Sequence, residues 1–458
     1  MSSAGRLAPD AIEARARRLN RFGFAFGSRF FVLLGVGLLA LGPALFEPRL
    51  ASVVGVWDAV VLTVWLVDLY RLPAADRFIV RRTWAAPAAL GVPSRVQLTI
   101  FNTSGVPVRA GIVDHVPRQL CAEPPTGYVE VPAKAQATYE YDIRPETRGE
   151  ASVGDVYLRY RTALRIAERW AIAGMHQTVV TYPNLTEAKR DALSLTRSRQ
   201  YDMERRAQRL HGSGRAFESL RDHRDGDELR DVCWTASARR GKLIARQYEI
   251  ERSQSVWILI DTGRLMRTQI ADTTKLDRAV NATLTLSQVA MTSGDRVGVL
   301  AYGRKIHHCL PADRGSVHLR RIIRDLAVIR GEAPEADHIG AASWILANQK
   351  RRSLVVWITD VPDTATTPDV IRAAAHLMQR HLVLVVIIGQ PDLVATAIRK
   401  PRNAQEMYHS AAAQEVIHRR DVLLARLRGQ GALALEADSR VSPALANAYL
   451  AVKQRNQL

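Results

Sequence analysis

The chain has 458 residues, of which 47% are hydrophobic, and its formal net charge is +19 at pH 7. This length is enough for two or three domains with their own cores, which excludes a single small domain. The three cysteines, Cys121, Cys233 and Cys309, are widely spaced and form no paired motif, so the sequence excludes a disulfide framework and favours a reducing compartment. The excess of basic residues bears on solubility and non-specific attraction, because net charge alone does not define a binding site.

Two apolar runs near the N-terminus predict membrane-spanning helices. They cover residues 30–46 and 50–70, and each is close to the roughly 20 residues that cross a bilayer as a helix. Arginines are frequent before the first run, and those after the second are Arg71, Arg77, Arg81 and Arg82. The positive-inside rule therefore predicts a two-pass protein of the cell (inner) membrane, with both termini and the large soluble part in the cytoplasm. Residues 1–29 are then a basic cytosolic or interfacial segment.

The second run contains an acidic residue, Asp58, well inside the predicted helix. A carboxylate near the centre of a bilayer costs about 2.5–3.5 kcal/mol on insertion scales. We expect Asp58 to face the partner helix or another copy of the chain, or to lie near the bilayer surface. A proton or ion site is the alternative, although two helices make a thin bundle for a pathway.

Residues 78–183 alternate between apolar and polar side chains. The alternation is clearest at residues 96–100, 139–143 and 156–161, and turn residues separate these runs. A period of two between turn signals is typical of half-buried antiparallel strands, so we expect an all-β, sandwich-like domain. Residues 184–254 follow as a connecting helix and a segment rich in charged residues.

The last part of the chain, residues 255–458, has a different pattern. Short, nearly continuous apolar runs alternate with segments of helical spacing, and the runs cover residues 256–261, 295–303, 354–360, 382–389 and 432–438. Such runs are typical of strands buried on both faces, and their alternation with helices predicts a doubly wound α/β domain with a mainly parallel sheet. Helix boundaries are also indicated. Thr367 and Ser442 each precede a proline, as an N-cap residue often does, and Gly294 closes a helical segment.

Two of the predicted strands end in an aspartate, Asp261 and Asp360. In open α/β sheets, ligands bind beyond the carboxyl ends of the strands, near the point where the strand order reverses. Two carboxylates on the strands expected to be central therefore indicate a site. The alternative is that each aspartate caps the next helix or braces a turn.

These strand endings carry a family resemblance. The sequences ILID and WITD, which end at Asp261 and Asp360, resemble the von Willebrand factor A fold, whose metal-ion-dependent adhesion site joins an Asp-x-Ser-x-Ser loop, a threonine loop and a Thr-Asp-Gly loop around Mg²⁺ or Mn²⁺. Asp261, Thr359 and Asp360 match that pattern. Both serines are absent, and residues 331–342 contain no threonine, although Asp337 offers a carboxylate there. Because a hard divalent ion takes about six oxygen ligands, the resemblance implies a weak, degenerate Mg²⁺ or Mn²⁺ site.

The segment before the first α/β strand carries a more specific resemblance. Ten positions resemble the signature of domain-of-unknown-function family fifty-eight, namely Phe217, Leu220, Arg221, Gly226, Asp227, Arg230, Trp234, Ala238, Arg239 and Leu243. His223 and Thr235 depart from it. The order of apolar hairpin, β region and α/β region is also similar to that family's layout. The resemblance implies a protein that works with a MoxR-type AAA+ ATPase in protein assembly or envelope stress, and no catalytic activity is established for the family as a group.

The signature segment also has a physical interpretation. Its arginines and acids can pair across a turn, and Trp234 then needs a pocket and Arg239 a partner. One interpretation is a clasp that holds the connecting segment against the first α/β strand. The other is a face that docks an ATPase or a substrate protein. Both interpretations rest on Phe217, Arg221, Asp225, Asp227, Arg230, Trp234 and Arg239.

Other groupings have less support from their spacing. His307 and Cys309 share a strand face, but no further zinc ligand has suitable spacing. Ser237, His223 and Asp227 would form a hydrolase triad, but the sequence has no Gly-x-Ser-x-Gly elbow. No phosphate-binding glycine loop follows a predicted strand, so ATP or dinucleotide chemistry is not indicated.

The sequence therefore predicts a non-enzymatic adaptor or scaffold anchored in the membrane, with a MoxR-type ATPase as its expected partner. One alternative is a metal-dependent hydrolase that uses Asp261, Asp360 and Asp337. A second is a nucleic-acid-binding membrane protein, although acids offset the basic residues of the connecting segment and no reading motif accompanies them.

Overall fold

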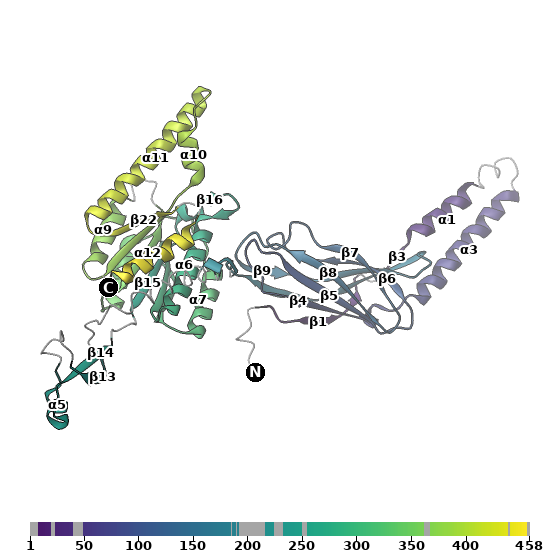
Figure 1. Ribbon diagram of the computed structural model, residues 1–458. Coiled ribbons are helices and arrows are strands. Elements are labelled where there is room, and N and C mark those ends of the chain that lie inside the picture. The colour runs from purple at the N-terminus through teal and green to yellow at the C-terminus, as the bar shows by residue number, and fades with distance from the viewer. Residues whose placement is uncertain are drawn as a thin grey trace. The chain divides into compact units, whose positions relative to one another are not determined.

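The structure is a computed structural model of the chain (Figure 1). It describes residues 8–19, 23–39, 49–184, 186–188, 190–191, 216–223, 232–249, 254–360, 367–437 and 440–455. The chain divides into two compact units, Met1–Asn184 and Leu185–Leu458. It combines many strands with helices, so the mixed α/β class expected from the sequence is confirmed.

Two apolar helices, α1 (Ser28–Leu39) and α3 (Arg49–Arg71), lie in the first unit. Among the described residues, one helical segment, Ser52–Arg77, is long and apolar enough to cross a membrane, and 17% of its apolar window is buried. α1 has 12 residues and is about 18 Å long, which is shorter than a hydrocarbon core of roughly 30 Å. The end of the first predicted run, residues 40–46, lies outside the described residues. The two-pass membrane topology therefore stays a prediction.

The two helices pack against each other through Trp57. Its indole Nε1 donates a hydrogen bond to the carbonyl oxygen of Leu33 at 2.9 Å. A Cβ atom added at Gly37 would lie 2.5 Å from the Trp57 ring and 3.2 Å from the Asp58 carboxylate, so glycine permits this close approach. Asp58 thus faces the partner helix, which is one of the positions expected for it.

The rest of the first unit is built from strands. One sheet has the order β1-β4-β5-β8, a second has the order β2-β11-β10-β6-β7 with β3 also paired to β11, and β9 pairs with β12. The strands are β1 (Ile12–Arg15), β2 (Arg17–Arg18), β3 (Phe24–Phe26), β4 (Phe78–Trp84), β5 (Ser94–Asn102), β6 (Val108–Asp114), β7 (Thr126–Val131), β8 (Gln136–Ile143), β9 (Gly149–Val153), β10 (Val156–Arg161), β11 (Ala167–Ala173) and β12 (Gln177–Thr181). The clearest predicted runs lie in β5, β8 and β10, whose burial alternates as expected.

The N-terminal segment differs from the expectation for residues 1–29. β1 pairs antiparallel with β4, while β2 and β3 pair with β11, so this segment adds strands to both larger sheets. Ile12 and Ala14 pack against the core, whereas Glu13 and Arg15 are exposed. Such alternation is typical of a strand. Sequence reasoning missed it because the arginines of this segment indicated a basic surface segment.

A buried carboxylate attaches α3 to the strands. Asp68 is fully buried, and its side chain accepts a hydrogen bond from the Thr162 hydroxyl at 2.5 Å. It also accepts from the backbone N–H groups of Ile166 and Ala167 at 3.2 and 2.9 Å. Because an unsatisfied buried carboxylate is costly, these donors fix the end of the helix relative to β11.

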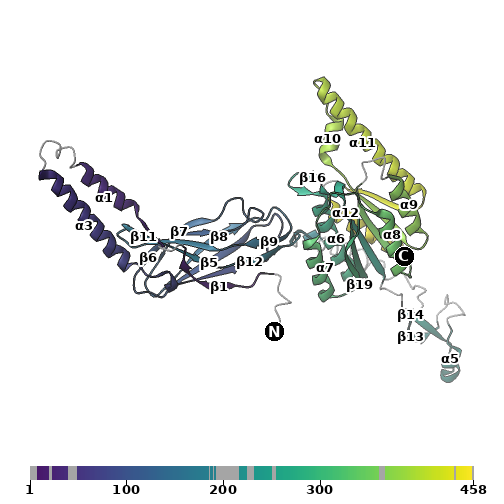
Figure 2. The ribbon, with the colours of Figure 1, turned by 180° about the vertical axis from the view of Figure 1, so that it is seen from behind.

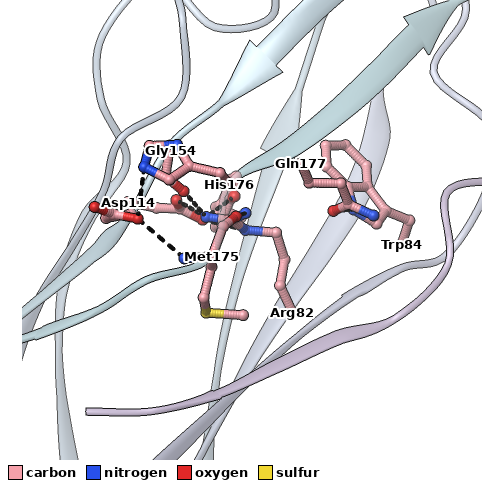
Figure 3. Close-up of polar contacts among 9 residues, drawn as sticks. Arg82, Trp84, Asp114, Gly154, Met175, His176 and Gln177 are labelled. Carbon is pink, nitrogen blue, oxygen red and sulfur yellow. Dashed lines mark hydrogen bonds and ion pairs between the residues drawn. The ribbon is translucent and has the colours of Figure 1, made fainter. Parts of the chain in front are cut away.

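The core between the strands contains a buried ion pair (Figure 3). Arg82 and Asp114 are both fully buried, and the guanidinium contacts the carboxylate through Nε at 3.1 Å and through Nη2. The other N–H groups of Arg82 donate to the carbonyl oxygens of Met175 and Gly154, both at 2.9 Å. The Tyr141 hydroxyl donates to Asp114 at 2.6 Å. The pair thus joins β4, β6 and β8.

The second unit contains a six-stranded sheet with the order β19-β18-β15-β20-β21-β22. All neighbouring strands are parallel except β18 and β19. Five strands match the five predicted runs, namely β15 (Ser255–Asp261), β18 (Arg296–Tyr302), β20 (Leu354–Thr359), β21 (Leu382–Ile388) and β22 (Leu433–Ala437), and β19 (Ile306–Asp313) adds an edge strand. Helices cover both faces of the sheet (Figures 1 and 2).

The helices of this sheet follow the predicted alternation. They are α6 (Lys275–Thr292), α7 (Ser316–Val328), α8 (His338–Asn348), α9 (Thr367–Met378), α10 (Pro391–Ile398), α11 (Ala404–Gly429) and α12 (Val441–Gln454). Gly294 follows α6 with a φ of 85°, as expected of a residue that ends a helix. The expectation that Ser442 is an N-cap was wrong, because α12 begins at Val441 and Ser442 lies in its first turn.

The predicted connecting helix lies largely outside the described residues, which include only 186–188 and 190–191 from its first part. These residues are helical. The signature segment forms a hairpin of β13 (Ala216–Asp222) and β14 (Ile244–Glu249), with α5 (Trp234–Arg240) between the two strands in sequence.

We expect Asp114→Ala to lower the free energy of unfolding by about 3–5 kcal/mol, because it leaves the Arg82 guanidinium buried without its counter-charge. Unfolding of the detergent-solubilised full chain, followed by circular dichroism, measures this loss. Glu13→Ala is the matched control, since it removes the partner of the exposed Arg81 in the same sheet and should cost about 0–1 kcal/mol. Equal losses for the two variants would show that the buried pair does not stabilise the unit.

Candidate functional site

The carboxyl ends of two central strands meet where the strand order reverses. β15 has β18 on one side and β20 on the other, and all three strands are parallel. β15 ends at Asp261, β20 ends at Thr359, and Asp360 follows directly. The structure therefore brings these three predicted residues to the crevice in which open α/β sheets bind ligands.

Both carboxylate oxygens of Asp261 accept hydrogen bonds from the chain. Oδ2 accepts from the Thr359 hydroxyl at 2.6 Å, and Oδ1 accepts from the backbone N–H of Gly263 at 2.7 Å. Burial raises the pKa of Asp261, while the charge of His338 and the hydrogen bond from Thr359 act in the opposite direction. Asp261 thus connects β15 to β20 and braces the turn after β15. Bracing a turn was the alternative to a ligand site for this aspartate.

Asp360 is paired with two cations from distant parts of the chain. Lys275, the first residue of α6, donates to Oδ2 of Asp360 through Nζ, and Arg420 of α11 approaches Oδ1 at 3.6 Å. All three side chains are 1% exposed. Arg420 also donates to Glu436 of β22 at 3.0 Å. Burial lowers the pKa of Lys275, and the charge of Asp360 opposes that shift.

A second polar network lies among the strand ends and α8. The Trp357 indole donates to the Tyr302 hydroxyl at 2.5 Å, and that hydroxyl lies 3.0 Å from Nδ1 of His338. The direction of the bond between Tyr302 and His338 is set by the tautomer of the imidazole. Burial lowers the pKa of His338 and raises the pKa of Tyr302. The network joins the ends of β18 and β20 to α8.

Asp337 and two glutamates of the same segment, residues 331–342, also have partners. Asp337 caps α8 by accepting from a backbone N–H in its first turn at 2.8 Å. Glu332 pairs with Nε2 of His307 at 2.7 Å, and Glu335 pairs with Arg264 at 2.7 Å. His307, which the sequence offered as a zinc ligand with Cys309, therefore contacts a carboxylate.

The oxygen atoms at these strand ends do not form a suitable ligand set for a divalent cation. A hard ion such as Mg²⁺ or Mn²⁺ needs about six oxygen ligands around it. Asp360 faces two side-chain cations, Asp261 uses both oxygens for N–H and O–H donors, and Asp337 caps a helix. Thr262 Oγ1 is buried without a hydrogen-bond partner, but one hydroxyl does not complete a coordination shell. The Lys275 ammonium supplies, from within the chain, positive charge beside the Asp360 carboxylate.

The signature segment is held together by a serine. Ser237 of α5 donates through Oγ to the Cys233 carbonyl and accepts from the Ile244 N–H, both at 2.9 Å. Gly241 ends the helix with a φ of 67°. The Ser237 hydroxyl thus joins α5 to β14, and this structural use argues against the hydrolase triad drawn from the sequence. Asp227, the third member of that triad, lies outside the described residues.

The expectation that Trp234 occupies a pocket was wrong. Its side chain is 64% exposed on α5, and Leu243, in the turn between α5 and β14, is 48% exposed. Arg239 is exposed as well. Asp225, Asp227 and Arg230, and the side chains of Phe217 and Arg221 in β13, lie outside the described residues.

Sequence reasoning missed the two cations that pair with Asp360. Lys275 directly follows Thr274, whose side chain and that of Asp277 form a capping box at the start of α6. A lysine in the first turn of a helix is unfavourable for the helix dipole, which is a signal that it has another partner. Arg420 lies three and four residues before buried leucines of α11, so it shares their face.

These features define a mixed α/β unit that follows a signature hairpin. A family profile described as "Protein of unknown function DUF58" matches residues 219–394, from β13 into α10. The match includes the described part of the hairpin from residue 219, the strand-end aspartates and Lys275. It covers less than half of the chain and leaves out the first unit and Arg420.

The proteins that match this chain in sequence are uncharacterised. The chain is 22% identical to the uncharacterized protein YeaD of Bacillus subtilis over 203 residues, which is 44% of this chain and 48% of that protein. It is 26% identical to the uncharacterized protein Rv1480 of Mycobacterium tuberculosis over 185 residues, which is 40% of this chain and 57% of that protein. The chain thus spans about half the length of these relatives.

Among solved structures, the chain aligns with proximal thread matrix protein 1 from the mussel byssus. The sequence identity is 13%, the TM-score is 0.27, and the alignment covers 42% of this chain and 46% of that chain. A TM-score this low does not establish a shared fold.

We expect Lys275→Met to lower the free energy of unfolding by about 3–5 kcal/mol, because it removes the buried ammonium group that contacts Asp360, and Arg420 is more distant. Asp360→Asn should have a loss of similar size. The double variant should lose less than the sum of the two, with an interaction energy of about 0.5–3 kcal/mol. Denaturant unfolding of the solubilised full chain measures all three, and additive losses would mean that the two side chains do not interact.

Divalent ions should leave the stability of the protein unchanged. A ligand that binds only the native state raises the unfolding temperature as its concentration increases. A thermal unfolding titration with Mn²⁺, with EDTA as the metal-free reference, checks this for the wild type. A rise that depends on Mn²⁺ concentration and disappears in Asp360→Asn would establish a divalent site and refute the assignment of Lys275 as the cation there.

Proposed function

We propose that this protein is a membrane-anchored, non-enzymatic adaptor or scaffold whose α/β unit binds protein partners. The first partner is a MoxR-type AAA+ ATPase, and the process is protein assembly or envelope stress, as the family resemblance implies. In this proposal the α/β unit is von Willebrand factor A-like, the two apolar segments are a hairpin anchor in the cell membrane, and the soluble part is cytoplasmic.

The exposure of Trp234 carries the proposal. A tryptophan buries about 150–250 Å² and is among the residues that contribute most to protein–protein binding. Exposing 64% of it to water does nothing for the stability of α5, because Ser237 already holds this helix on β14. Leu243 adds a second exposed apolar side chain to the same short segment. We therefore assign Trp234 and Leu243 as the docking face.

The charges around the docking face indicate the chemistry of the partner. Arg239 and Arg240 lie in the last turn of α5, and both are exposed. Lys242 follows them and pairs with Asp222 at 2.8 Å across the hairpin. Complementary charge steers association and suppresses wrong partners. The partner surface should therefore offer an apolar pocket for the indole with carboxylates at its rim.

The pairing of the strand-end carboxylates supports an adaptor over a hydrolase. A general base or a metal-activating carboxylate has to be available to the substrate or the ion. Asp360 is engaged by Lys275 and Arg420, and Asp337 caps α8. The strand ends then serve as a rigid, metal-free support for the unit.

The apolar helices of the first unit support the membrane anchor. Side chains along α1 and α3 are exposed on the isolated chain, including Phe31, Leu39, Val56 and Leu66. Soluble proteins rarely expose contiguous apolar patches larger than a few hundred Å². A bilayer covers such a surface, and α3 has the length to cross it.

We expect Trp234→Ala to reduce recovery of the ATPase at least about tenfold, because a buried tryptophan anchor contributes about 2 kcal/mol or more. The measurement is affinity purification of the tagged, detergent-solubilised full chain after mild cross-linking, with the ATPase quantified by mass spectrometry.

Tyr408→Ala is the matched control, since it removes another aromatic side chain, 73% exposed on α11, and should leave recovery unchanged. Circular dichroism of both variants shows whether they stay folded. Equal recovery with Trp234→Ala and the wild type would refute the docking face. Absence of the ATPase from the wild-type sample would refute the partner.

A further inference from the structure

A pocket lies beside the end of α3 in the first unit. Its volume is about 290 Å³, and its lining includes Arg18, Phe24, Leu69, Tyr160, Arg169 and Trp170. Leu69 belongs to the last turn of α3, and the other five residues belong to four strands of one sheet. Two arginines and three aromatic residues at the end of an apolar helix suggest a binding site rather than a gap in packing.

Strand register explains why the two arginines share this pocket. Arg169 of β11 lies opposite Phe24 of β3 and Tyr160 of β10. Arg18 of β2 lies opposite Ala171, which is two residues from Arg169 and therefore on the same face of β11. Opposite and diagonal neighbours on one face are about 5–8 Å apart, so both guanidinium groups are within reach of a single anion.

The cations are held close to the Tyr160 hydroxyl. Arg169 donates to the Pro73 carbonyl at 3.3 Å and to a carbonyl in the last turn of α3 at 3.1 Å, and the Tyr160 hydroxyl donates to Pro73 at 2.8 Å. Burial raises the pKa of Tyr160 to about 12, while the charges of Arg169 and Arg18 act in the opposite direction. Asp76 adds one carboxylate to the same surroundings. The described residues that line the pocket thus include two arginines, and Asp76 is a nearby acid.

Aromatic rings place this pocket at the level of a membrane surface. Trp65 of α3 packs against Phe24 and Phe26, with ring centroids 5.6 and 4.6 Å apart, and Phe26 stacks on Phe30 at 4.4 Å. Belts of aromatic side chains are typical of the boundary between hydrocarbon and headgroups. With 23 residues, α3 is about 35 Å long and exceeds a hydrocarbon core of roughly 30 Å, so its last turn reaches the headgroups.

We propose that this pocket binds the phosphate of an anionic phospholipid headgroup. The proposal rests on the membrane anchoring in the proposed function and is independent of the ATPase partner. Guanidinium groups bind phosphate oxygens through paired, charge-assisted hydrogen bonds, which Arg18 and Arg169 provide. Phe24 and Leu69, which also line the pocket, contact the glycerol and the first acyl carbons. Free phosphate has no apolar part for these side chains, so the lipid is the ligand.

The test is native mass spectrometry of the full chain after reconstitution in nanodiscs that contain phosphatidylglycerol and phosphatidylcholine. The wild type should retain phosphatidylglycerol in preference. Arg18→Gln should reduce the bound phosphatidylglycerol about tenfold, as expected for the loss of one charge-assisted contact. Arg17→Gln is the matched control, because Arg17 lies opposite Ile172 on the other face of the sheet, and it should leave retention unchanged.

Equal retention of the two lipids by the wild type, or equal losses in Arg18→Gln and Arg17→Gln, would overturn the site. Displacement of phosphatidylglycerol by added inorganic phosphate would overturn the lipid as the ligand. Alkaline carbonate extraction tests the anchoring separately. Release of the chain from membranes would refute the anchoring itself, whereas a chain that stays in the membrane without preferring phosphatidylglycerol refutes the lipid site alone.

Discussion

Buried carboxylates that require partners organise this chain, and Asp360 with Lys275 and Arg420 is the case in the α/β unit. Lys275 comes from the start of α6, and Arg420 comes from α11 on a different part of the sheet. A buried charge without a partner is strongly destabilising. The start of α6 and the Arg420 side of α11 therefore have to meet at the end of β20 for the sheet to be stable. Arg82 and Asp114 impose the same condition on the strands of the first unit.

Because Asp360 is paired, the hairpin of β13 and β14 is a better candidate for a binding surface than the strand ends of the sheet. Lys275 and Arg420 already neutralise Asp360, and Asp261 accepts hydrogen bonds from Thr359 and Gly263, so the two strand-end carboxylates do not require a metal ion. Trp234 is in the opposite situation, because a large apolar surface is exposed while the helix that carries it is already held by Ser237. Function in this proposal depends on surface that is exposed rather than on charge that is buried.

In the first unit, polar contacts near the end of α3 join this apolar helix to the strands. Asp68 accepts from the loop between β10 and β11 and from the first residue of β11, and Arg169 donates to a carbonyl in the last turn of α3. These bonds satisfy groups that a bilayer cannot satisfy, since hydrocarbon offers no hydrogen-bond partners. A headgroup phosphate between Arg18 and Arg169 would extend this set of contacts from the protein to the lipid.

Local pattern was sufficient for much of this chain. The period of two in residues 78–183 and the apolar runs after residue 255 depend only on near neighbours, so the sequence alone determined most strands and the placement of Asp261 and Asp360 at strand ends. It did not determine partners, because Lys275 is 85 positions from Asp360.

Arg82 shows the same limit. In the sequence, Arg82 is one of the arginines that follow the second apolar run. In the structure, it lies on the same buried face of β4 as Phe78 and Val80. Whether such a charge faces water or a carboxylate, and whether Trp234 is covered or exposed, was decided only by the tertiary structure. The physical reason is that burial and pairing depend on segments brought together by folding, which no local window of sequence contains.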